Sequence, residues 1–171
     1  NFFGIETLNK RSGEIIGKGM HPQKVKQTLD DLKKIWKNDV SITAGLIVGL
    51  PYETRATLAE LENYLLDPNC ALDAWVIHPL ILLDGLASMF GQDPGRYGYR
   101  FNKNESRMQW YNDEMNFSQA IDIATAIRNN TMSKAKINSW SHMRLQNLGL
   151  AREEVNSMNV QNYFEIGRAH V

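Results

Sequence analysis

The sequence lacks the features that mark several common classes of protein. It contains a single cysteine, Cys70, which excludes an intramolecular disulfide framework and a self-contained iron–sulfur site held by several thiolates. Its 19 basic and 19 acidic residues cancel, so its charge gives no reason to expect a nucleic-acid or membrane partner. No apolar run in the sequence approaches the roughly 20 residues of a membrane span. These absences favour a cytoplasmic protein with the length of one ordinary domain.

Both ends of the chain are unusual. The sequence opens at Asn1 without a methionine, and it closes with Ile-Gly-Arg-Ala-His-Val at residues 166–171. That hexapeptide is what ATCGGAAGAGCACACGTC encodes, a string that resembles a common sequencing-library adapter. We therefore expect residues 166–171 to be an artefact and the chain to be a piece of a longer one.

Apolar periodicity in the first half predicts alternating strands and helices. Short apolar runs predict strands, and leucines at helical spacing after Pro22 and Thr54 predict two amphipathic helices. The expected strands are Phe2–Glu6, Ser41–Val48 and Ala74–Ile77; the expected helices carry Val25, Leu29, Leu32 and Trp36, then Leu58, Leu61 and Leu65. This alternation predicts βαβ units and a parallel sheet.

The second half has a different texture. Residues 91–99 are rich in turn residues and predict a loop. A helix is expected around Phe117–Ile127 with Asn116 or Ser118 as its cap, and a looser one from Ser133 to Leu148 that ends at Gly149. We expect Trp110 and Tyr111 to pack a helical extension, residues 84–165, against the first half.

The most informative segment is Ile42–Thr54, a buried-strand pattern that ends in Gly49-Leu50-Pro51-Tyr52-Glu53-Thr54. A strand that stops at a Gly-x-Pro turn before a helix forms a βα loop, where barrels of βα units carry their chemistry. This segment resembles the Gly-Leu-Pro-x-Glu-Thr stretch of radical S-adenosylmethionine enzymes, especially the group often fused to cobalamin-binding domains. Gly4-Ile5-Glu6-Thr7 is similar to that family's Gly-x-Glu-Ser/Thr strand end, and Asn9–Met20 to the loop that follows it.

The resemblance implies a fold and a chemistry. Residues 1–83 would be the second half of a (β/α) barrel that binds S-adenosylmethionine and cleaves it reductively at a [4Fe-4S] cluster. An external electron donor, and possibly cobalamin, would take part. The defining Cys-x3-Cys-x2-Cys motif does not occur in this chain, so the cluster ligands are expected upstream of Asn1.

The resemblance also implies cofactor-binding residues. Glu6 would bind ribose hydroxyls or an ammonium group, and Lys18, where the family more often has arginine, would meet the cofactor's carboxylate. Gly45, Ile47 and Gly49 would line the adenine ring. Each residue also has a structural alternative: Glu6 would lie in solvent or pair with Lys18, Lys18 would be a solvated loop residue, and the other three would pack a βα unit.

Other polar residues leave alternatives open. His78 follows the third strand, where a histidine can transfer protons or ligate metal, or simply be structural. Glu53 is expected to cap the N-terminus of its helix, and Cys70 to be an inert thiol. Two other functions therefore remain: a non-catalytic α/β binding module, and a barrel enzyme with non-radical acid/base chemistry that uses His78.

Overall fold

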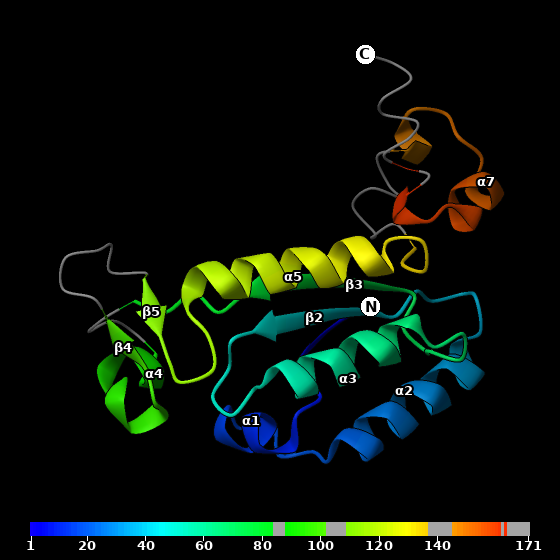
Figure 1. Cartoon of the computed structure of the whole chain (residues 1–171). Coiled ribbons are helices and arrows are strands. Elements are labelled where there is room, and N and C mark those ends of the chain that lie inside the picture. The colour runs from blue at the N-terminus through cyan, green and yellow to red at the C-terminus, as the bar shows by residue number, and fades with distance from the viewer. Residues whose placement is uncertain (84–87, 102–108, 137–144, 162, 164–171) are drawn as a thin grey trace.

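The structure is a computed structural model, and it describes residues 1–83, 88–101, 109–136, 145–161 and 163. It is a mixed α/β protein built on a three-stranded parallel sheet with the strand order β1-β2-β3 (Figure 1). A second sheet, with two short antiparallel strands, lies apart from the first. Within these described ranges, no helix is long and apolar enough to cross a membrane.

The first half alternates strands and helices as the sequence predicts. Its elements are β1 (Phe2–Glu6), α1 (Lys10–Ile15), α2 (Pro22–Trp36), β2 (Thr43–Val48), α3 (Arg55–Leu66) and β3 (Ala74–Pro79). Of the residues expected to face inward, Leu29 of α2 and Leu58, Leu61 and Leu65 of α3 are buried, and Val25, Leu32 and Trp36 of α2 are half-buried against the same core. The mixed α/β class and the parallel sheet are thereby confirmed.

The second half adds small elements and one long helix. These are α4 (Met89–Gln92), η1 (Gly95–Tyr97), β4 (Arg100–Phe101), β5 (Trp110–Tyr111), α5 (Phe117–Thr131) and α7 (Arg152–Ser157). Asn116 is the N-cap of α5 and forms a reciprocal capping box with Gln119. Ala120, Ala124 and Ile127 of α5 join the same core as the leucines of α3, so one core includes residues from both halves.

The three longest helices all pack on one face of the sheet. Phe3 of β1 stacks on Trp36 of α2, and Trp75 of β3 donates a hydrogen bond to Thr131 of α5. Phe3 and Trp75 both pair with Ala44 of β2, so their side chains point to the same face. The opposite face carries Gly45, against which the exposed ring of Phe2 lies. Among the described residues, no helix covers that opposite face, which we call the open face.

Some elements differ from the sequence-based expectation. β3 runs two residues further, to Pro79, and α1 forms where a loop was expected. Of the helix expected over Ser133–Leu148, residues 137–144 lie outside the described part, and Lys136 forms an isolated bridge with Asn159 instead of starting a helix. Gly149 has φ 93°, as a helix C′ residue requires. Residues 166–171 also lie outside the described part.

Candidate functional site

The end of β1 brings together two of the residues that the sequence singled out. Lys18 Nζ lies 3.8 Å from Glu6 Oε1, and both side chains are partly exposed. An ion pair of that length in contact with solvent is weak, because water screens it. Both groups therefore keep most of their capacity to bind a charged ligand.

The backbone creates the space for this pair. A side chain on Gly4 would lie 2.5 Å from Glu6 Oε1 and 3.5 Å from Lys18 Nζ, so the carboxylate and the ammonium occupy the volume above Gly4. Glu6 itself has φ 68°, and the register between β1 and β2 shifts between Gly4 and Glu6. Left-handed backbone at a residue other than glycine is strained and is enriched at functional sites.

Three further residues of interest lie on the open face of the two neighbouring strands. Gly45 pairs with Gly4, and Ile47 pairs with His78 of β3. Because side chains alternate along a strand, Gly45, Ile47 and His78 point to the same face as the volume above Gly4. Ile47 is half-buried and His78 is exposed, whereas Gly45 is covered by the ring of Phe2.

Gly49 has a different environment. It has φ 101°, and a Cβ atom there would lie 2.5 Å from the ring of Trp110. Its N–H donates to Glu53 Oε2, and its carbonyl accepts a hydrogen bond from the Tyr99 hydroxyl at 2.6 Å. The structure therefore brings Glu6, Lys18, Gly45 and Ile47 to the open face and packs Gly49 inside the loop that follows β2.

Glu53 does not cap α3, contrary to the expectation from sequence. Thr54 is the N-cap and forms a reciprocal capping box with Thr57. The Glu53 carboxylate, which is 2 % exposed, instead accepts hydrogen bonds from the Thr7 hydroxyl at 2.8 Å and from the N–H groups of Gly49 and Leu50 at 2.8 and 3.1 Å. Burial raises the pKa of Glu53 to about 7, although the three hydrogen bonds oppose that shift.

The loop after β2 is also fastened to α1. The hydroxyl of Ser12, a fully buried residue, donates to the carbonyl of Pro51 at 2.7 Å, and the Asn9 amide donates to the carbonyl of Tyr52. Arg11 lies over the Tyr52 ring, 4.0 Å from its centroid. Together with Thr7 and Glu53, these contacts join the carboxyl ends of β1 and β2 into one rim, which we call the β1–β2 rim.

Sequence reasoning missed Thr7, Ser12 and Tyr99 as members of this region. Thr7 directly follows β1, and Ser12 lies in α1, the next element, at the end of the sheet where the carboxyl ends of parallel strands collect functional groups. That position was the available signal for them. Tyr99 had none, because it comes from a turn-rich segment far along the chain.

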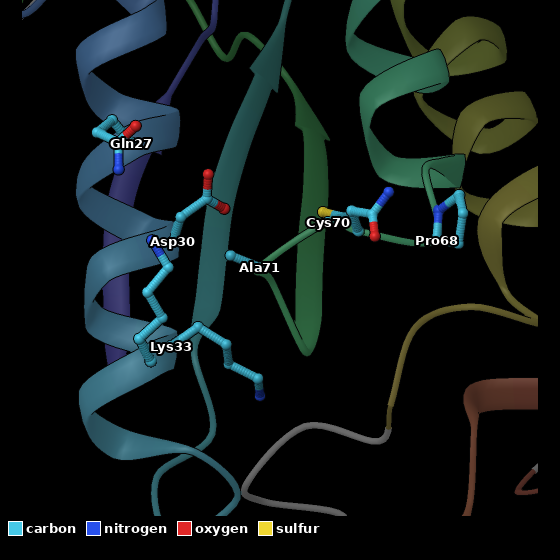
Figure 2. A pocket seen from close by; sticks show the side chains of 8 residues that line it. Gln27, Asp30, Lys33, Pro68, Cys70 and Ala71 are labelled. Atoms are coloured by element: carbon cyan, nitrogen blue, oxygen red, sulfur yellow. The ribbon is translucent and has the colours of Figure 1, made fainter.

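The amino-terminal ends of the strands, opposite the β1–β2 rim, have a different environment. A cavity of about 520 Å³ lies between α2 and the segment that precedes β3, and Figure 2 shows Asp30 and Lys33 on α2 facing the segment with Cys70 and Ala71. Asp73, nearby and 5 % exposed, accepts from Lys33 Nζ at 2.6 Å and pairs with Lys136 at 3.0 Å. None of the predicted cofactor-binding residues lines this cavity.

Cys70 fits the expectation of an unreactive thiol. It is a free cysteine, and burial raises its pKa, which disfavours the reactive thiolate. Cys70 precedes β3, so it lies at the amino-terminal ends of the strands, opposite the β1–β2 rim. Among the residues that the structure describes, no three His, Cys, Asp or Glu side chains are grouped so that they could hold a metal ion.

Comparison with models of known protein families gives no match for this chain, and comparison with curated protein sequences gives none either.

Proposed function

We propose that this chain is the second half of a radical S-adenosylmethionine catalytic barrel, with the helical segment packed on the same sheet. The observation that carries the proposal is that Glu6, Lys18 and Ile47 gather at the carboxyl end of a parallel sheet, on or beside its helix-free face. Ligands of open and closed α/β sheets bind at the carboxyl ends of the strands.

The layering of the chain supports a barrel more than a doubly wound sheet. Doubly wound sheets carry helices on both faces, whereas barrels carry them only on the outside. Here the strand order follows the chain order, and α2, α3 and α5 all pack on one face. In the complete barrel, the open face would line the interior.

The side chains suit the two chemically different ends of S-adenosylmethionine. The Glu6 carboxylate can accept hydrogen bonds from ribose hydroxyls or from the ammonium group, and Lys18 can pair with the carboxylate. Ile47 offers an apolar surface for the adenine ring. Gly45 allows close approach once the exposed Phe2 ring turns aside.

The residues of this chain do not fit the [4Fe-4S] cluster that the proposed chemistry needs. One half-buried thiol at the far edge of the sheet cannot supply the three thiolates that a cofactor-binding four-iron cluster needs. In this proposal the cluster ligands come from outside this chain, the electron comes from an external donor, and the protein is cytoplasmic. When bound, S-adenosylmethionine supplies the radical chemistry, and the residues described here bind it and orient it.

Cofactor affinity tests the proposal. In a protein that contains this segment and the residues upstream of it, we expect Glu6→Gln and Lys18→Ala each to weaken S-adenosylmethionine binding about ten-fold, since each removes one charge-assisted contact. Titration calorimetry measures the change. The matched control is Lys10→Ala, because Lys10 also lies 3.8 Å from a glutamate, Glu14, but on the exposed surface of α1. Unaltered affinity in both site variants would contradict the assignment.

A second candidate function rests on His78. Its exposed side chain points from the open face beside Ile47, where an imidazole can act as a general acid or base. A barrel enzyme with non-radical chemistry would use it in that way. Activity that persists in air, in protein freed of iron, and that is lost in His78→Ala, would favour this candidate over the first.

A further inference from the structure

Five aromatic side chains from the second half of the chain form a continuous cluster beside the β1–β2 rim. Consecutive ring centroids are 4.8 to 6.3 Å apart, with the edge-to-face geometry that aromatic pairs prefer. The aromatic cluster consists of Phe90, Tyr97, Tyr99, Trp110 and Phe117. Tyr99 and Trp110 are its most buried members, each 1 % exposed.

These two side chains bind the ends of two neighbouring strands. The Tyr99 hydroxyl donates to the carbonyl of Gly49, just after β2, at 2.6 Å. The indole N–H of Trp110 donates to the carbonyl of Leu80, just after β3, at 2.8 Å. The Trp110 ring also fills the space where a side chain on Gly49 would lie.

The end of β2 is therefore held from two sides. The backbone N–H of Gly49 donates to Glu53, and the backbone carbonyl of Gly49 accepts from Tyr99. Both polar groups of Gly49 therefore have fixed partners. At position 99, packing alone would need only the ring, and phenylalanine would supply it. The polar atoms of Tyr99 and Trp110 instead fix the carbonyls at which β2 and β3 leave the sheet.

We propose that Tyr99 and Trp110 are positioning residues for the ligand site, so that the segment after the sheet is part of the site's construction. They act through the carbonyls of Gly49 and Leu80. By fixing these carbonyls they fix the ends of β2 and β3, and with them the positions of Ile47 and His78. This inference rests on the proposed function, because the ligand it refers to is S-adenosylmethionine.

The test compares two tyrosine-to-phenylalanine variants in a protein that contains this chain and the residues upstream of it. Tyr99→Phe keeps the ring and removes the hydroxyl on Gly49. Tyr97→Phe is the matched control, since half-buried Tyr97 packs on Phe90 in the same cluster. S-adenosylmethionine binding is measured by calorimetry at a temperature at which every variant is fully folded.

We expect Tyr99→Phe to bind S-adenosylmethionine about five-fold more weakly and Tyr97→Phe to bind it normally. Trp110→Phe provides a second variant with the same expected direction. A lower melting temperature with unchanged affinity in both Tyr99→Phe and Trp110→Phe would mean that they only stabilise the fold, and would overturn this inference alone. Failure of the unmodified protein to bind S-adenosylmethionine would overturn the proposed function and this inference with it.

Discussion

Replacing Glu53 with alanine is expected to lower the free energy of unfolding by about 3 kcal/mol at pH 7. The change removes the acceptor for three donors, the Thr7 hydroxyl and the N–H groups of Gly49 and Leu50. These donors lie in a buried part of the β1–β2 rim, where water cannot easily replace the carboxylate. Denaturant unfolding monitored by circular dichroism measures the loss.

The control for this prediction is Glu53→Gln, which keeps the shape and one acceptor oxygen. Its amide can donate to the Thr7 oxygen while its carbonyl accepts from the backbone, so we expect a much smaller loss than in Glu53→Ala. Equal losses in the two variants would mean that the side-chain volume and the single acceptor oxygen that glutamine keeps contribute nothing, and would contradict this prediction.

Glu53 also predicts a dependence of stability on pH. Its pKa in the folded protein is raised from 4.5 to about 7, so between these values the folded state binds the proton more tightly than the unfolded state. The part of the stability that comes from the bound proton is therefore complete below pH 4.5, falls as the pH rises, and is gone above about pH 7, where the hydrogen bonds of the side chain remain. The size of that part is about 3 kcal/mol.

Tyr99, whose hydroxyl binds the same residue Gly49, does not obscure this effect. Burial, and then the charge of Glu53, raise the pKa of Tyr99, so its phenol stays protonated throughout this range. The measurement is the difference between the stability curves of the unmodified protein and Glu53→Gln, in which other groups cancel. Parallel curves would show that Glu53 does not titrate in this window.

Gly49→Ala is expected to be even more disruptive, with a loss of about 4 kcal/mol. The residue has φ 101°, which a side chain disfavours, and its new Cβ would lie 2.5 and 2.8 Å from two atoms of the Trp110 ring. Trp110 cannot move aside without losing its hydrogen bond to Leu80 and its contact with Tyr99. Thermal and denaturant unfolding measure the effect.

Gly45→Ala is the matched comparison on the same strand. Its Cβ would lie 2.8 Å from the Phe2 ring, a contact almost as close, but Phe2 is 65 % exposed and can turn into solvent. Gly45 also lacks a positive φ, so we expect a loss below about 1 kcal/mol. Similar losses at the two glycines would contradict the structural account of the loop after β2.

The sequence was sufficient for the elements whose side chains repeat regularly. The leucines of α2 and α3 recur at helical spacing, and β2 is a short run of apolar, partly branched residues that ends at Gly49 and Pro51. The helix α1 has no such repeat, because glycines interrupt the segment in which it lies; its one signal was Asn9, which accepts from the N–H of Ser12. Strands of two residues, such as β4 and β5, are too short for any period.

The residues of the candidate site also fall into those that the sequence predicts and those that it does not. Glu6 and Lys18 were found because they adjoin one strand end, and the structure brings them together. Glu53 was assigned to the helix beside it because Tyr52, with φ 66°, turns the chain in a way that the sequence does not reveal. Tyr99 and Trp110 reach the end of β2 from 50 or more residues away, and no local pattern encodes a contact of that range.

The most direct test of the central claim is to read the coding sequence that lies immediately upstream of Asn1 in the source DNA. A barrel whose second half begins with β1 needs about three more βα units, and three thiolates on the loop after the first of those strands can bind three irons and leave the fourth for the cofactor. We predict such units with Cys-x3-Cys-x2-Cys on that loop. A start codon directly before Asn1, or upstream βα units without the cysteine trio, would contradict the radical S-adenosylmethionine function.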